Sequence, residues 1–180
     1  MILKSVAIEV DDDYFEYMAR GKGEDDTRSE VVMLLPRPDD KILTLTKSFY
    51  PEHIFNLPSG GIRTGESYEQ AFVREVAEET GLDIGIALTV GRIEHLLSCP
   101  SGELSFASYI IMGAKSAQTP CPFDLKEQII GYRDASIEEI RELAVKMRGL
   151  KGKWLGFGRF RATALDFAAD YLAKSLGFEQ

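Results

Sequence analysis

The sequence predicts an α/β sandwich, in which helices pack against a β-sheet. Apolar runs rich in β-branched residues, typical of strands, occur together with segments whose apolar residues recur at helical spacing. The two kinds of segment do not alternate regularly, which argues against a doubly wound parallel sheet. With 180 residues, of which 44% are hydrophobic, the chain is expected to form one domain, residues 1–180.

The N-terminal third predicts two strands of a hairpin preceded by a strand and a helix. Residues 2–10 suit a first strand, and residues 14–20 suit a short helix that is closed by the following glycines. The polar stretch 21–29 is expected to be a loop. A continuous apolar run at 31–35 predicts a buried strand, and the alternating segment 41–46 predicts its hairpin partner.

Three further strands are expected downstream. Residues 54–57 form a short apolar segment that Pro58 ends. Residues 88–97 and 106–112 are longer and rich in apolar residues, so both are predicted to be strands.

The clearest helix covers residues 67–80. Ser67 is a suitable N-cap with Gln70 as its capping-box partner, and Gly81 occupies the position where helices commonly end. Its apolar row comprises Tyr68, Phe72 and Val76. A second capping box, Ser136 with Glu139, predicts a helix that ends at Gly149, and residues 160–176 predict a final helix.

Composition and charge limit the partners. Acids outnumber bases 29 to 21, giving a net charge of −8, which argues against nucleic acid or an anionic membrane as the partner. The N-terminus lacks the apolar stretch of a signal peptide. Two cysteines, Cys99 and Cys121, are too few for a disulfide scaffold. A soluble, cytoplasmic protein with reduced thiols is therefore expected.

Acidic residues are concentrated in the helix predicted at 67–80. Glu75, Glu78 and Glu79 have the spacing that places side chains on one helix face, where like charges repel. Glu66 lies just before the helix, and Arg74 is the nearby base. A solvated acidic face is one explanation. The other is a site for a hard divalent cation, because carboxylate oxygens are preferred ligands of Mg²⁺ and Mn²⁺.

A glycine-containing turn precedes this helix and favours the second explanation. Gly60 and Gly61 follow Pro58, and glycines in such a turn let the backbone approach a ligand closely. We therefore expect Gly60 and Gly61 to be substrate-binding positions. The turn would bring a ligand next to the acidic helix face.

The segment from Gly60 to Leu82 resembles the Nudix box. The box has Gly, five residues, Glu, seven residues, then Arg-Glu-apolar-any-Glu-Glu-any-Gly-apolar, and this chain matches every specified position, with Val76 in the first apolar slot. The resemblance implies an α/β/α sandwich with a mixed sheet. It also implies a hydrolase that cleaves a nucleoside diphosphate linked to another moiety and depends on a divalent cation, Mg²⁺ first and Mn²⁺ as the alternative.

The same resemblance assigns roles by position. The metal ligands it implies are Glu75, Glu78 and Glu79, assisted by Glu66. Glu78 and Glu79 would be the main catalytic glutamates, Arg74 would orient the carboxylates through charge-assisted hydrogen bonds, and Gly60 would support the loop geometry. Metal dependence also follows from charge, because a protein of net charge −8 needs a cation to bind a diphosphate at an acidic helix.

The general base is expected outside the box. Related enzymes place it in an acidic downstream loop, which here corresponds to residues 124–134, so Glu127 is the first candidate and Glu103 the second. Two alternatives are an ordinary exposed loop acid at Glu127 and a box glutamate acting as the base.

Features outside the box favour ADP-ribose or a related nucleotide sugar as substrate. Pro100 lies 18 residues beyond Leu82 (100 − 82), close to where ADP-ribose-type members often carry a proline. Residues 151–161 form a basic and aromatic segment in an acidic chain. Its aromatic residues could stack on a base, or could simply pack at the start of the last helix. The candidates for base contacts are Trp154, Phe157, Phe160, Tyr50 and Phe55.

Other functions are also weighed. A second enzymatic function is a (d)NTP pyrophosphatase or an RNA 5′-end hydrolase. A non-catalytic nucleotide-binding sensor is a third, which the complete set of glutamates argues against. The expected partner is a nucleotide-derived small molecule, without a membrane and without nucleic acid, and a homodimer is considered as well.

Overall fold

The computed structural model describes residues 1–20 and 28–175. The strands are β1 (Ile2–Glu9), β2 (Ser29–Leu34), β3 (Ile42–Lys47), β4 (Ser59–Gly61), β5 (Ile86–Cys99), β6 (Gly102–Gly113) and β7 (Ile129–Ala135). The helices are α1 (Asp12–Arg20), α2 (Tyr68–Thr80), α3 (Ile137–Arg148) and α4 (Leu155–Ser175). Short 3₁₀ turns occur at Pro38–Asp40, Leu125–Glu127 and Gly152–Trp154. Most of the predicted loop at 21–29 lies outside the described residues, but Ser29 already belongs to β2.

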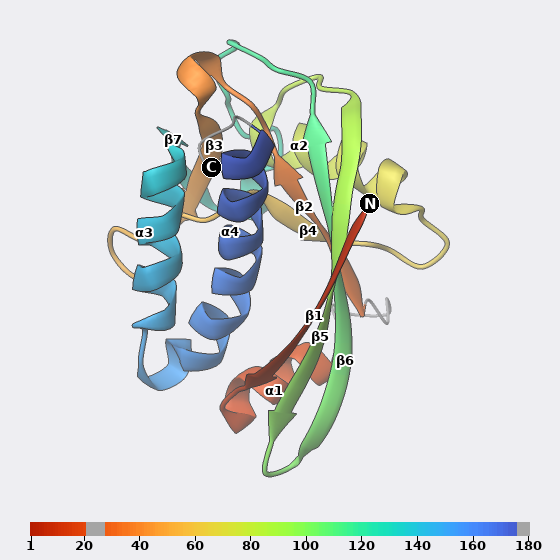
Figure 1. The fold of residues 1–180 in the computed structure, drawn as a ribbon, viewed down its shortest axis with the longest axis vertical. Coiled ribbons are helices and arrows are strands. Elements are labelled where there is room, and N and C mark those ends of the chain that lie inside the picture. Colours follow the sequence, from red (N-terminus) through yellow and green to blue (C-terminus); the bar gives the residue numbers. More distant parts are fainter. Residues whose placement is uncertain (21–27, 176–180) are drawn as a thin grey trace.

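A mixed five-stranded sheet forms the centre of the molecule, in the order β1-β5-β6-β2-β4 (Figure 1). β1 runs parallel to β5 and β2 runs parallel to β6, whereas the other two pairs are antiparallel. β3 and β7 pair in a second, two-stranded antiparallel sheet. The predicted α/β sandwich is confirmed, as is the mixed sheet.

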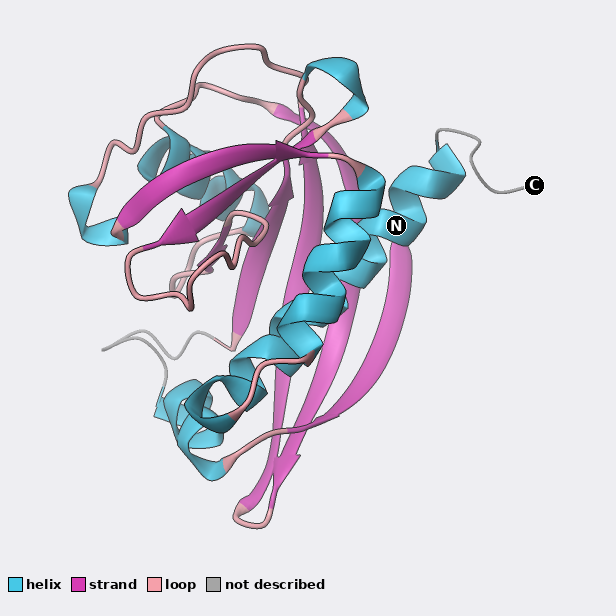
Figure 2. Ribbon diagram, turned by 90° about the vertical axis from the view of Figure 1, so that its left-hand side faces the viewer, coloured by secondary structure: helices cyan, strands magenta, loops and turns pink. Residues whose placement is uncertain are grey.

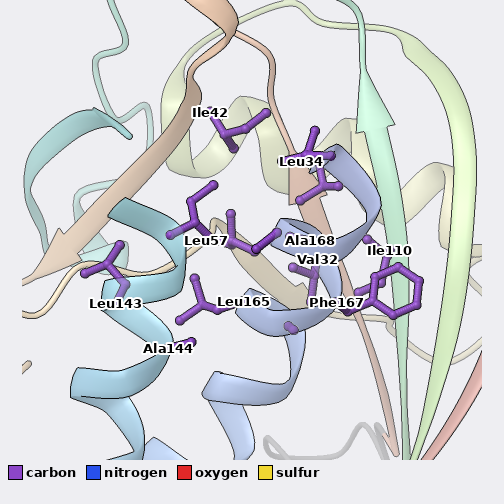
Figure 3. Close-up of a cluster of buried hydrophobic side chains, with 14 of the residues drawn as sticks. Val32, Leu34, Ile42, Leu57, Ile110, Leu143, Ala144, Leu165, Phe167 and Ala168 are labelled. Carbon is purple, nitrogen blue, oxygen red and sulfur yellow. The ribbon is translucent and has the colours of Figure 1, made fainter. Parts of the chain in front are cut away.

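In β2, consecutive side chains point alternately to the two faces of the sheet, so both faces are covered. Val31 and Met33 pack with Phe72 of α2 on one face of the sheet. Val32 and Leu34 point to the opposite face, toward α3 and α4, which lie side by side (Figures 1 to 3). Because neighbouring side chains of a strand point to opposite faces, a continuous apolar run marks a strand that is covered on both.

Both capping boxes form as predicted. In α2 the Ser67 hydroxyl accepts from the Gln70 N–H, and the Gln70 side chain accepts from the Ser67 N–H. Gly81 ends the helix in the left-handed conformation, with φ of 65°. Ser136 and Glu139 begin α3 in the same way. Satisfying the first free N–H groups fixes where each helix begins.

The predicted hairpin is wrong. Residues 41–46 do form β3, but β3 pairs with β7 instead of continuing along β2. Only the beginning of a hairpin exists, in which the Leu43 N–H donates to the Leu35 carbonyl. β2 already has β6 on one side and β4 on the other, so it has no free edge for β3.

Other element boundaries also differ from the predictions. Residues 54–57 contain only an isolated bridge between Asn56 and Leu45, and the strand lies later, at β4. β5 and β6 are longer than predicted at both ends. The last helix begins at Leu155 rather than at residue 160, and the expected end at residue 176 is outside the described range. No helix in the described ranges is long and apolar enough to cross a membrane.

Candidate active site

Arg74 is the central cation of the α2 carboxylates. Its guanidinium donates to both oxygens of Glu66, each at 2.8 Å. It also donates to Glu75 at 2.6 Å, to Glu78 at 3.1 Å and to the Gly61 carbonyl at 2.9 Å. The side chain therefore links the turn before α2 to the acidic face of the helix. The sequence-based role of Arg74, to orient the glutamates, stays a prediction that these contacts make possible.

The charges of this group stabilise one another. The hydrogen bonds to Glu66 raise the pKa of Arg74 further above its ordinary value, and Glu75 adds to the effect. In return, the hydrogen bond from Arg74 lowers the pKa of Glu66. Both oxygens of Glu66 are occupied by the Arg74 fork, an arrangement that is geometrically specific. Glu66 thus contacts the cluster through Arg74.

Glu79 is fully buried. Its Oε2 accepts from the Ser59 N–H at 3.0 Å, and its Oε1 lies 2.9 Å from the Lys47 ammonium but accepts no well-formed hydrogen bond. Burial raises the pKa of Glu79 to about 7, although the attraction of Lys47 acts in the opposite direction. A carboxylate held this way is poorly compensated and suits a further cation.

Lys47 joins Glu79 to Glu127. The Lys47 ammonium, at the end of β3, lies 2.6 Å from Glu127 Oε2 as well as 2.9 Å from Glu79. Burial opposes the charge of this ammonium, yet the two carboxylates outweigh burial and raise its pKa. Glu127 therefore reaches the cluster from the loop before β7, and its role as general base stays a prediction. Lys47 was missed, because a single lysine at a strand end carries no motif.

Gly60 packs directly against Glu75. A Cβ atom at position 60 would lie 1.8–2.2 Å from the carboxyl atoms of Glu75, so a side chain there would force this carboxylate to shift. Glu75 is only 6% exposed, and burial raises the pKa of its carboxyl although Arg74 acts to lower it. The glycine is thus needed for close approach of the carboxylate rather than for an unusual backbone angle.

The donor set fits a divalent metal ion, although the carboxylates take other partners here. Within residues 1–20 and 28–175, no three His, Cys, Asp or Glu side chains converge in a ready coordination site. Instead, the carboxylates surround Arg74 and Lys47, the nearest cations. Oxygen donors suit Mg²⁺ and Mn²⁺, and the buried Glu79 Oε1 lacks a hydrogen bond. Glu75 and Glu79 each have an oxygen that accepts no hydrogen bond in the described structure.

Two predicted residues lie away from this cluster. Val31 pairs with both Gly60 and Tyr109, and Glu103 is six residues before Tyr109 on β6. At ~3.3 Å per residue, Glu103 is about 20 Å along the sheet from the glycine turn. Pro100 lies in the turn between β5 and β6, at the same end of the sheet. The structure therefore brings neither residue to the α2 glutamates.

The aromatic candidates separate into two groups. Phe160 is 2% exposed and packs among core residues, including Phe106. Phe55 packs against the core under α3 and α4. By contrast, Tyr50, Trp154 and Phe157 line a cavity next to Lys47 and Ser59. This group is the one placed to contact a substrate that reaches Glu79.

Comparisons with known proteins identify the family and the fold. The sequence profile of the NUDIX domain matches residues 26–149. A stretch of 42 residues is 45% identical to MutT4 of Mycobacterium tuberculosis, a candidate mutator protein, and covers 23% of this chain but only 17% of that protein.

Solved structures resemble the fold. A MutT protein from Methanosarcina mazei Go1 matches with a TM-score of 0.52 and 20% identity, over 78% of this chain and 93% of that one. An Ap4A hydrolase from C. elegans matches with a TM-score of 0.51 and 17% identity, over 81% and 98% of the two chains. At these identities the likeness is one of fold.

Proposed function

The chain belongs to the Nudix family of pyrophosphohydrolases, and we propose that it hydrolyses the diphosphate linkage of a nucleoside diphosphate joined to another moiety. ADP-ribose or a related nucleotide sugar is the favoured substrate. The observation that carries this proposal is the buried Glu79 carboxylate with Glu75 and Glu127 beside it. Lys47 and Arg74 compensate these carboxylates in part, but the buried Glu79 Oε1 still accepts no hydrogen bond. A metal cation there would complete the compensation, and a cation is what a diphosphate needs in order to bind here.

The proposed metal ligands are Glu75, Glu78 and Glu79. When bound there, Mg²⁺ or Mn²⁺ would neutralise phosphate charge and lower the pKa of a coordinated water. Arg74 donates to one carboxylate oxygen of Glu75 and one of Glu78. The second oxygen of each carboxylate accepts no hydrogen bond from Arg74. Glu66 would act by fixing Arg74, since both of its oxygens already accept from that side chain.

Glu127 is the proposed general base. The attacking water must lose a proton as its oxygen bonds to phosphorus and the bridging oxygen leaves with the bond electrons. Lys47 holds Oε2 of Glu127 at 2.6 Å, so Oε1 is the atom proposed to accept that proton. The same ammonium contacts Glu79, which fixes the base relative to the proposed metal ligands. Gly60 and Gly61 are proposed to let the protein backbone approach the substrate closely.

We propose that residues 1–180 act together as one hydrolase domain with a small-molecule substrate. The net charge of −8 makes long RNA an unfavourable partner. A nucleotide sugar has one base and one diphosphate, and this combination suits one aromatic cavity beside one carboxylate cluster. Pro100, at the far end of the sheet, gives no support to the choice of ADP-ribose.

A substrate panel tests the proposal. The protein would be incubated with Mg²⁺ and with ADP-ribose, sugar nucleotides, dinucleoside polyphosphates and (d)NTPs, and phosphorylated products would be quantified. We expect turnover of nucleotide sugars, lowered at least about hundredfold by Glu79→Gln. Glu69→Gln is the matched control, because Glu69 is an exposed glutamate of the same helix. Turnover of triphosphates alone would overturn the substrate class, and no turnover at all would overturn catalysis.

A further inference from the structure

A cavity of about 300 Å³ opens beside the carboxylate cluster. We call it the aromatic cavity, and its walls include Tyr17, Phe49, Tyr50, Trp154 and Phe157. Its volume is at the lower end of the range for small-molecule sites. The rings meet at steep angles: Phe157 is edge-on to Trp154 with centroids 5.4 Å apart and tilted against Tyr50 at 5.3 Å. Such walls present aromatic surface from more than one direction.

Cations surround the same cavity. Lys47, Lys153 and Arg161 line it, in a chain whose net charge is −8, against the single acid Asp13. The Lys153 ammonium lies 5.6 Å from the centre of the Trp154 ring, and Arg161 is held by Glu30 at 2.7 Å. Aromatic walls with basic residues at the rim match a ligand that is both planar and anionic, which is the chemistry of a nucleotide.

The cavity is continuous with the proposed active site. Two of its lining residues, Lys47 and Ser59, also contact Glu79, at 2.9 and 3.0 Å respectively. A ligand in the cavity therefore lies one side chain away from the proposed metal ligands.

Segments outside the family profile build most of this cavity. Tyr14 and Tyr17 come from α1, Lys153 and Trp154 from the 3₁₀ turn before α4, and Phe157 from the start of α4. The family profile matches residues 26–149 and includes none of these. The two segments are fixed to each other, because the Gly156 N–H donates to Asp11 at 2.9 Å and a Cβ at Gly156 would collide with Tyr14. The contacts between these two segments hold the walls of the cavity in place. Most of these walls come from residues outside the range that the family profile matches.

We propose that the aromatic cavity is the base subsite of the enzyme. In it, the nucleobase of the substrate stacks on the wall formed by Trp154 and Phe157, while the diphosphate extends past Lys47 to the α2 glutamates. This inference rests on the proposed function, since it gives the substrate of that same site its base contact. It assigns to residues 151–161 a role in substrate selection.

Trp154 supplies a direct test, because it is the only tryptophan of the chain. Tryptophan fluorescence would be followed while AMP, or ribose 5-phosphate as the probe without a base, is added in the presence of Mg²⁺. We expect saturable quenching by AMP and none by ribose 5-phosphate at the same concentrations. Equal responses to the two probes, or none to AMP, would overturn the base subsite.

Variants then test the wall itself. Phe157→Leu keeps an apolar side chain but removes the ring, so the AMP dissociation constant should rise about ten- to hundredfold. Phe49→Ala is a second variant with little risk to folding, because Phe49 is 51% exposed, and it should raise the constant at least threefold. Tyr109→Leu is the matched control, since Tyr109 stacks on Tyr68 and does not line the cavity. Constants within twofold of wild type for both cavity variants would overturn the proposal.

Hydrolysis measurements on the same variants separate the two proposals. If Phe157→Leu raises KM for the nucleotide sugar and changes kcat little, both proposals stand. If substrates are hydrolysed but AMP neither quenches Trp154 nor is affected by Phe157→Leu, the base subsite is wrong and the hydrolase stands. If AMP binds as expected but no diphosphate is cleaved, the hydrolase is wrong and the subsite stands.

Discussion

Replacing Gly60 by alanine probes the closest contact in the candidate site. The new Cβ would lie 1.8–2.2 Å from three atoms of the Glu75 carboxyl, so the carboxylate must move. Glu75 is 6% exposed and its Oε1 is 2.6 Å from Arg74. Movement therefore strains a buried ion pair instead of simply displacing a side chain into solvent.

The magnitude follows from overpacking. Inserting a methyl group into a filled site destabilises a protein by about 1–3 kcal/mol. Alanine also lowers the conformational entropy of the unfolded chain, which stabilises the folded protein by about 0.4–1 kcal/mol where the backbone angles suit alanine. We expect Gly60→Ala to lower the free energy of unfolding by about 1–2 kcal/mol. Gly85→Ala is the control: nothing lies within 4 Å of its new Cβ, so it should be neutral or slightly stabilising.

Urea unfolding of four proteins isolates the cause. The wild type, Gly60→Ala, Glu75→Ala and the double variant would form a double-mutant cycle, monitored by circular dichroism. Because the three atoms nearest the added Cβ all belong to Glu75, the glycine substitution should become nearly neutral once Glu75 is truncated. If Gly60→Ala lowered the stability equally in the wild type and in Glu75→Ala, the loss would not come from the contact with Glu75.

Three more predictions concern charge. Lys47→Met removes the ammonium beside the buried Glu79 carboxylate and should destabilise the protein by about 3–5 kcal/mol at pH 8, measured by urea unfolding. Burial, aided by Arg161, lowers the pKa of His95 to about 4, so the unfolded state takes up a proton between pH 6.5 and 4 that the folded state does not. Stability should fall by roughly 3 kcal/mol over that window, and His95→Gln should flatten the fall. Arg74→Lys cannot reproduce the fork to the glutamates and should weaken Mn²⁺ binding about ten- to hundredfold in a titration.

Each of these predictions has a contrary outcome. Unchanged stability of Lys47→Met at pH 8 would mean that Glu79 does not depend on this ammonium. An identical loss of stability on acidification with and without His95 would assign the proton uptake to other groups. Wild-type Mn²⁺ affinity in Arg74→Lys would show that the fork does not position the ligands.

Local signals predicted the helices and the acidic cluster well. The capping boxes at Ser67 and Ser136 depend on hydrogen bonds between residues three apart, so the sequence alone specifies them. The glutamates of α2 share a face for the same reason, namely helical spacing. The burial of β2 on both faces likewise follows from its continuous apolar run.

Predictions that depended on distant partners were less successful. The pairing of β3 with β7 is set by the occupied edges of β2, which no local pattern reveals. Lys47 contacts Glu127, which is 80 residues away in the sequence. The residues around each of them contain no pattern that predicts this contact. Long-range pairing of this kind is decided by tertiary packing.

The early start of α4 has a similar explanation. Gly156 and Gly158 are weak helix formers, which made residue 160 the expected start. In the fold, a Cβ at Gly156 would lie 2.6 Å from Tyr14, and one at Gly158 would lie 2.1 Å from the Met147 carbonyl oxygen. The glycines are present because α1 and α3 approach the helix closely, and tertiary contacts outweigh the helix propensity.

Equilibrium binding of Mn²⁺ tests the central claim most directly, which is that the α2 carboxylates hold a catalytic divalent cation. The electron paramagnetic resonance signal of free Mn²⁺ would be measured for the wild type and for a variant carrying Glu75→Gln, Glu78→Gln and Glu79→Gln, with hydrolysis assayed on the same samples. We expect the wild type to bind Mn²⁺ and the variant to lose both this binding and hydrolysis. Equal Mn²⁺ binding by the two proteins would contradict it.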